Sequence, residues 1–169
     1  MTVQEAIRGR RSVRKYKSDP VPAEHLHQML EAAMLAPSAM NRRPWQFAVI
    51  RDRGLREQIA QVSPYAKPIL AAPMAVLVSG LPDPTRPPEM QFWQQDCGAA
   101  IQNLLLEAWG LGYGTCWCGL YPMLDRAMAV KAILGLEGDA IPLGIVALGV
   151  PDEAPARRGF YEESKVKEY

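Results

Sequence analysis

Two short apolar runs restrict the fold of this chain more than any other feature of its sequence. They are MAVLVSG at residues 74–80 and LGIVALGV at residues 143–150. Both are far shorter than the roughly 20 residues that a membrane-spanning helix needs, and runs of this length favour strands. The first predicts a strand that is buried on both faces. WQFAVI at residues 45–50 and TCWCGL at residues 115–120 predict two further strands.

Helical patterns lie between these strands. Thr2 and Glu5 form a capping-box pattern that predicts a short helix ending near Gly9. Apolar residues spaced three and four apart predict an amphipathic helix over residues 22–36, which Pro37 stops. Further helices are predicted over residues 55–62, 89–109 and 123–134. At 169 residues and without an internal repeat, the pattern is typical of one domain covering residues 1–169.

The overall charge of the chain is nearly balanced. It has 19 basic and 18 acidic side chains, which disfavours a general electrostatic attraction to nucleic acid or to a membrane surface. The amino-terminal residues lack the apolar core of a signal peptide, and three cysteines do not make a secreted disulfide framework, so we expect a cytoplasmic location. His25 and His27 point to different faces of a predicted helix, and we interpret them as exposed side chains rather than metal ligands.

Positive charge is concentrated in RGRRSVRKYK at residues 8–17, which holds six basic side chains and no acidic one. Three interpretations compete: a nucleic-acid patch, a solvated face, and a pocket for a small anion. The balanced net charge and the lack of an aromatic stacking platform in this run weigh against nucleic acid. Guanidinium groups bind phosphate through paired, charge-assisted hydrogen bonds, which suits the anion pocket. The proline-rich residues 81–89 predict a loop, which we place beside a site.

Four separated segments together resemble the FMN-dependent nitroreductase family. They are RRSVRKY at residues 10–16, APSAMNRRPWQF at residues 36–47, GYGTCWCGLYP at residues 112–122, and the pair Arg157 and Arg158. The resemblance spans nearly the whole chain. It implies an α+β fold with three layers, in which helices flank a central mixed, mainly antiparallel sheet. It also implies a homodimer with FMN in a groove between the chains.

The resemblance carries site residues with it. The FMN-binding residues that it implies are Arg10, Arg11, Ser12, Arg14, Pro37, Ser38, Asn41, Cys116, Trp117, Cys118, Gly119, Arg157 and Arg158. Two positions depart from the family pattern, because Arg43 stands where members often have Gln and Cys118 where some have an acid. Cys116 and Cys118 are either a redox pair or buried thiols, and their separation along one strand favours buried thiols.

The implied activity is hydride transfer from NAD(P)H to the flavin and then to a nitroaromatic, quinone or similar acceptor, in a ping-pong cycle. The flavin carries this chemistry, so no catalytic side chain is required. Phe92, Trp93 and Arg43 are expected to border the substrate. Two alternatives stay open: a flavin-binding protein without turnover, such as a sensor or store, and a flavin enzyme of the same fold with other chemistry, such as reductive dehalogenation.

Overall fold

Four antiparallel strands form the centre of the structure, a computed structural model that describes residues 1–156, 159 and 161–169. The strands are β1 (Trp45–Ile50), β2 (Met74–Gly80), β3 (Gly114–Gly119) and β4 (Ile141–Gly149), in the spatial order β1-β2-β4-β3. Every neighbouring pair is antiparallel. The four predicted strands are therefore confirmed, and β2 is buried along its whole length, as its apolar run predicts.

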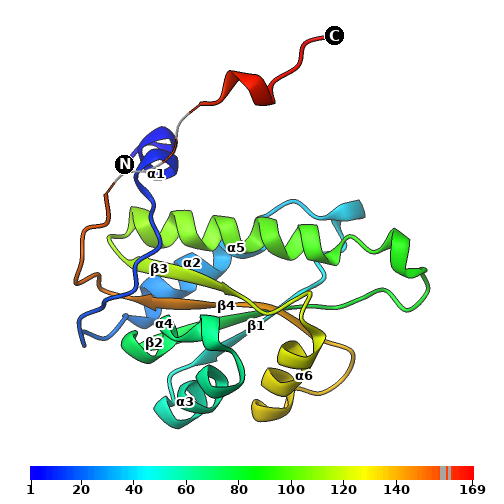
Figure 1. The fold of residues 1–169 in the computed structure, drawn as a ribbon, viewed down its shortest axis with the longest axis horizontal. Coiled ribbons are helices and arrows are strands. Elements are labelled where there is room, and N and C mark those ends of the chain that lie inside the picture. Colours follow the sequence, from blue (N-terminus) through cyan, green and yellow to red (C-terminus); the bar gives the residue numbers. More distant parts are fainter. Residues whose placement is uncertain (157–158, 160) are drawn as a thin grey trace.

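Helices cover both faces of this sheet, which confirms the three-layer α+β prediction (Figure 1). On one face lie α2 (Ala23–Met34) and α5 (Trp93–Gly110), packed against side chains such as Val76 and Val146. On the other face lie α3 (Arg53–Val62), α4 (Pro68–Ala71) and α6 (Leu124–Ile133), packed against Leu77 and Ile145. Successive residues of one strand point to opposite faces, so β2 and β4 contribute to both hydrophobic clusters.

Element boundaries differ from the predicted ones where a capping residue or a proline decides them. Helix α5 begins at Trp93 rather than at residue 89, because two prolines lead into a 3₁₀ turn at Pro88–Met90 and an extended Gln91 follows it. Helix α3 begins at Arg53, since the side chain of Asp52 caps it. Helix α2 ends at Met34. Pro37 disfavours helical geometry for the residue before it, so the helix does not continue to the proline.

The amino-terminal segment places the basic cluster beside β3. Helix α1 (Val3–Gly9) has the predicted capping box, and the chain then runs along the outer edge of the sheet. Ser12 forms a parallel bridge with Thr115, and Tyr16 forms an antiparallel bridge with Pro151, just after β4. The Ser12 bridge adds a parallel contact to an otherwise antiparallel sheet.

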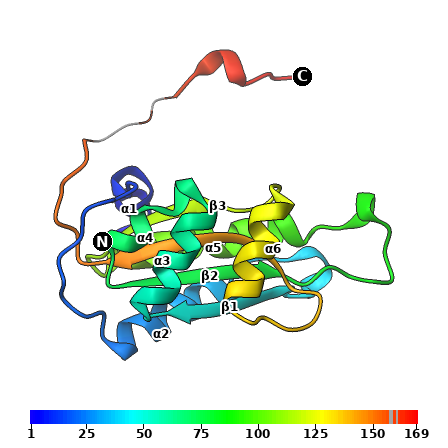
Figure 2. The same ribbon diagram turned by 60° about the horizontal axis from the view of Figure 1, so that its bottom comes forward.

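The carboxy-terminal segment first follows the basic cluster and then leaves the body of the chain. The N–H of Asp152 donates to the carbonyl of Lys15 at 2.9 Å. Residues 161–169, with a 3₁₀ turn at Glu163–Lys165, extend away from the sheet and its helices (Figure 2). Tyr161 is 77% exposed there. Within the described part of the chain, no helix combines the length and apolarity that crossing a membrane would require.

Candidate functional site: two cavities beside β3 and α5

The open edge of β3 provides the backbone for a candidate binding site. The N–H of Val13 donates to the carbonyl of Thr115 at 2.8 Å, so the backbone polar groups of Thr115 point away from β4. Successive residues of an antiparallel strand direct these groups to opposite sides, so residues two apart direct them to the same side. The backbone groups of Trp117 and Gly119 therefore point to the same outer edge as those of Thr115, beyond the part that the amino-terminal segment covers.

A cavity of about 360 Å³ lies at this edge and brings two distant parts of the sequence together. Its lining residues are Arg10, Ser12, Gln102, Leu105, Trp117, Gly119, Tyr121 and Leu143. A guanidinium group and a hydroxyl group, which bind oxyanions, thus stand beside an aromatic ring and outward-facing backbone. Trp117 is 41% exposed although it lies on a strand whose neighbouring side chains are buried. We call this space the β3 cavity.

Arg11 and Arg14 do not line the β3 cavity. The side chain of Arg11 donates from Nε to the carbonyl of Ala156 at 3.2 Å. The backbone N–H of Arg14 donates to the carboxylate of Glu153 at 2.5 Å. These contacts hold residues 153–156 against the basic cluster. Arg157 and Arg158, predicted to bind FMN, lie outside the described residues.

Cys116 and Cys118 are buried free thiols, which agrees with one of the two interpretations of the sequence. Their side chains belong to the cluster beneath α3, α4 and α6, on the face opposite Trp117. A hydrogen bond with the Cys118 thiol lowers the pKa of Cys116 to about 7, with smaller contributions from Arg14 and Ser12. The same hydrogen bond, together with burial, raises the pKa of Cys118. Because both thiols lie on the opposite face of β3, they do not border the cavity.

The second sequence segment with predicted site residues lies apart from the β3 cavity, between α2 and β1. Here Met40, Asn41 and Arg43 have positive φ angles of 52°, 53° and 51°, an uncommon backbone for residues other than glycine. Side chains hold the turn. Ser38 Oγ accepts from the backbone N–H of Arg43 at 2.9 Å, and Asn41 Oδ1 accepts from Arg43 Nε at 3.0 Å. Pro37 and Asn41 are exposed.

Asp96 anchors this turn to α5. It is only 8% exposed, and its Oδ1 accepts from the backbone N–H of Ala39 at 3.0 Å. An acid in the first turn of a helix is ordinary by itself, so the sequence offered no signal for this anchoring role.

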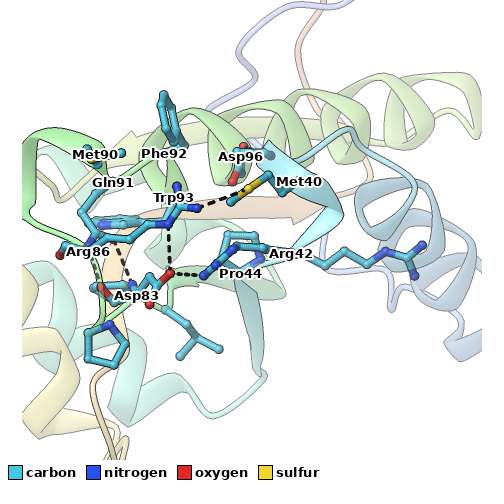
Figure 3. A pocket seen from close by; sticks show the side chains of 15 residues that line it. Met40, Arg42, Pro44, Asp83, Arg86, Met90, Gln91, Phe92, Trp93 and Asp96 are labelled. Carbon is cyan, nitrogen blue, oxygen red and sulfur yellow. Dashed lines mark hydrogen bonds and ion pairs between the residues drawn. The ribbon is translucent and has the colours of Figure 1, made fainter.

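A second cavity, of about 330 Å³, lies between this turn and the proline-rich loop (Figure 3). Its lining includes Arg43, Phe92 and Trp93, the three residues predicted to border the substrate. Phe92 is 42% exposed. Its side chain points away from Asp83 in Figure 3. We call this space the loop cavity.

Asp83 and Gln91 fix the proline-rich loop. Asp83 forms ion pairs with Arg42 and with Arg86, the latter at 3.3 Å. Hydrogen bonds from Thr85, followed by the charge of Arg42, lower the pKa of the Asp83 carboxyl. Gln91 accepts from the N–H of Asp83 at 2.9 Å and donates to the carbonyls of Asp83 and Arg86. These contacts give the loop a defined conformation. The prolines in the sequence predicted its position beside a site, but they could not predict these contacts.

An aromatic pair stands between the two cavities. Trp93 lines the loop cavity, Tyr121 lines the β3 cavity, and their rings meet edge to face with centroids 4.9 Å apart. Trp93 is 4% exposed and packs on Gly80, where a β-carbon would lie 2.0 Å from the indole. Ordinary packing thus explains most of the Trp93 ring. The two cavities are therefore separated by one pair of side chains, Trp93 from α5 and Tyr121 from the segment after β3.

One of the two histidines differs from its interpretation. His27 is exposed, as expected, but His25 is half-buried. The Nδ1 atom of His25 lies 2.7 Å from the hydroxyl of Tyr113, and the two rings meet edge to face. The helical pattern could not show this partner, which is 88 residues away in sequence. Among the described residues, no group of three or more His, Cys, Asp or Glu side chains is arranged to hold a metal ion.

Comparison with known proteins matches this architecture to one family. The sequence profile of the nitroreductase family matches residues 7–81 and 64–150. A relative from Methanothermobacter thermautotrophicus, whose name pairs NADH dehydrogenase with NAD(P)H nitroreductase, is 40% identical over 98% of this chain and 86% of its own. Another with the same name, from Archaeoglobus fulgidus, is 37% identical over 90% of this chain and 86% of its own.

Solved structures agree with these sequence matches. A nitroreductase-like protein from Desulfovibrio desulfuricans, crystallised in complex with FMN, superposes with a TM-score of 0.86. It is 30% identical, and the superposition covers 100% of this chain and 97% of that one. A structure from Parabacteroides distasonis, named like the archaeal relatives, superposes with a TM-score of 0.89 at 34% identity over 98% of this chain and 96% of its own.

Proposed function

This chain belongs to the nitroreductase family of oxidoreductases, and we propose that it is an FMN-dependent enzyme that passes electrons from NAD(P)H to a small acceptor such as a nitroaromatic compound or a quinone. One observation carries the proposal. Arg10 and Ser12 from the amino-terminal segment meet Trp117 and Gly119 of β3 in a single cavity. The bridge between Ser12 and Thr115 brings these distant segments together.

The residues of the β3 cavity fit FMN by their chemistry. A phosphate group needs a cation and hydrogen-bond donors, which Arg10 and Ser12 supply. The flavin ring presents acceptors along its edge, and the outward N–H groups of Trp117 and Gly119 are donors of the kind that such an edge needs. The half-exposed indole of Trp117 adds an apolar surface for a planar ring.

When bound, FMN supplies the chemistry by accepting a hydride from NAD(P)H and passing electrons to the acceptor in a second half-reaction. The residues of the chain bind, orient and neutralise. Arg10 offsets negative charge in the cavity. The backbone of β3 fixes the position of the ring edge, since its own geometry is held by β4. Because the flavin carries the electrons, the proposal assigns no proton transfer to Arg10 or Tyr121, which line the cavity.

We further propose that the active form is a homodimer in the cytoplasm. Ser38 and Asn41 do not line the β3 cavity of their own chain, although the family pattern assigns them to the flavin. A second copy that places its turn at residues 38–43 over the β3 cavity would bring them there. The exposure of Asn41 and the hydrogen bonds that hold the turn support this arrangement.

Anaerobic reduction tests the proposed function. The purified chain is loaded with FMN, freed of unbound flavin and mixed with NADPH or NADH without oxygen. We expect the visible flavin absorbance to bleach and to return when a quinone or a nitroaromatic compound is added. A bound flavin that neither nicotinamide reduces would contradict the enzyme and favour a flavin-binding sensor or store. A colourless protein after loading would contradict both.

A further inference from the structure

The indole of Trp117 occupies a space that Gly144 leaves open. Trp117 belongs to β3, and Gly144 lies on the neighbouring strand β4, one diagonal step away, since Trp117 faces Val146 and Gly119 faces Gly144 in the register. A β-carbon at Gly144 would lie 2.4 Å from Trp117 Nε1 and 3.0 Å from its Cδ1. Real β-carbons essentially never come within 3.0 Å of a heavy atom outside their own chain neighbours, so the indole can occupy this place only because residue 144 is a glycine.

The far end of the same indole reaches α5. A β-carbon at Gly98 would lie 3.9 Å from Trp117 Cη2, which is ordinary van der Waals contact. The ring is therefore in contact with the sheet at Gly144 and within reach of the helix at Gly98. Glycine inside a strand weakens it and often marks a close approach, and here the object that approaches is the indole.

The contacts at Gly144 and Gly98 do not bury the indole of Trp117. Trp117 remains 41% exposed, and it lines the β3 cavity with Arg10 and Ser12. A large aromatic side chain that is held by neighbouring elements and is partly exposed in a cavity offers a surface for stacking another planar ring. We propose that the indole of Trp117 is a fixed stacking platform for the isoalloxazine ring, and that Gly144 is the positioning residue that leaves room for the platform. This inference rests on the proposed function.

The platform separates two contributions to flavin binding. Stacking acts on the ring, whereas Arg10 acts on the phosphate. Loss of the platform should weaken FMN and riboflavin by the same factor, because the two ligands share the ring. Loss of the Arg10 guanidinium should weaken FMN and leave riboflavin nearly unchanged.

Four variants test the platform by titration of FMN and riboflavin and by the fluorescence of the bound flavin. An indole in contact with a flavin quenches its fluorescence, because the excited ring takes an electron from the indole. We expect Trp117→Leu to weaken both ligands about tenfold and to raise the fluorescence of the bound flavin several-fold. Gly144→Ala should act in the same direction, since its methyl group displaces the indole. Gly98→Ala, the matched control, should change neither quantity.

The double variant Trp117→Leu/Gly144→Ala separates displacement of the indole from other effects of the added methyl group. With the indole gone, the methyl group meets no ring, although its carbon still lies 3.2 Å from the carbonyl oxygen of Cys118, and denaturant titration measures any loss of stability from that contact. The double variant should bind flavin no more weakly than Trp117→Leu alone. Unchanged affinity and fluorescence in both single variants, with a wild-type chain that retains FMN, would overturn the platform and leave the proposed function intact. A wild-type chain that does not retain FMN would overturn the proposed function and the platform together.

Discussion

Val13 lies directly against Gly114 at the start of β3. A β-carbon at Gly114 would stand 2.8 Å from both Cβ and Cγ1 of Val13, and Val13 is fully buried. This contact, together with the hydrogen bond from Val13 N–H to the carbonyl of Thr115, seals the amino-terminal segment to the edge of the sheet. The position of Arg10 and Ser12 in the β3 cavity depends on that seal.

Gly114→Ala should therefore weaken flavin binding without touching the cavity. The added methyl group forces Val13 away from β3, and overpacking of this kind costs about 1–3 kcal/mol of unfolding free energy. Denaturant titration measures this loss, and FMN titration should show weaker binding. Gly110→Ala is the control, because a β-carbon at that position meets nothing within 4 Å. Wild-type stability and affinity in Gly114→Ala would contradict the assigned role of the seal.

Arg10→Ala should weaken FMN binding roughly tenfold or more, because a charge-assisted hydrogen bond to phosphate contributes on the order of 1.5–3 kcal/mol. Arg8 provides a matched control: it belongs to the same basic run and to α1, is exposed, and does not line the β3 cavity. Arg8→Ala should leave the dissociation constant unchanged. Equal losses in the two variants would instead show that the run attracts FMN by its general charge, and the loss would then diminish steeply with added salt.

The layered arrangement of the fold follows from local hydrophobic patterns in the sequence. The apolar runs of β2 and β4 have residues suited to both faces, so they had to lie at the centre of a covered sheet, and they do. Boundaries depended on single side chains, such as the Asp52 cap of α3, that a periodicity does not detect. The short helix α4 was missed because one turn is too short to have a period.

The site was predictable in its backbone segments and less so in its side chains. Segments 10–16 and 112–122 do meet, but Arg11 turns toward Ala156, and the thiols of β3 face away from the cavity. Asp96 and Tyr121 were not foreseen, because their roles arise from contacts with residues far away in the sequence. Long-range contacts of single side chains leave no periodic trace, whereas strand parity made the outward direction of Trp117 recoverable from the register.

Gln91→Leu should open the proline-rich loop. Gln91 makes three hydrogen bonds to the backbone of Asp83 and Arg86, and their loss frees the segment that carries Arg86. We expect the backbone N–H groups of the loop, among them that of Asp83, to exchange with deuterium several times faster than in the wild-type chain, measured by mass spectrometry of the fragments. Gln95→Leu changes an exposed residue of α5 and serves as the control. Identical exchange rates would show that the ion pairs of Asp83 hold the loop without Gln91.

The two thiols of β3 should titrate as an unequal pair. The hydrogen bond from Cys118 places the pKa of the Cys116 thiol at about 7, and burial raises the pKa of Cys97 to about 12, so that Cys97 stays protonated. The ultraviolet absorbance of thiolate should show one step near neutral pH. Cys118→Ala removes the donor, and because burial alone raises a thiol pKa, the step should move to higher pH.

The lowered pKa of Cys116 makes the unfolding free energy of the chain increase with pH near and above neutrality. The pKa of Cys116 is lower in the folded chain than in the unfolded one, so the unfolded chain binds more protons between about pH 7 and the ordinary thiol range. The contribution of Cys116 to stability is present above that range and is lost as the pH falls through about 7. Denaturant midpoints measured across this window should rise with pH in the wild-type chain and rise less in Cys116→Ala. Equal slopes in the two chains would mean that Cys116 stays protonated in the folded protein.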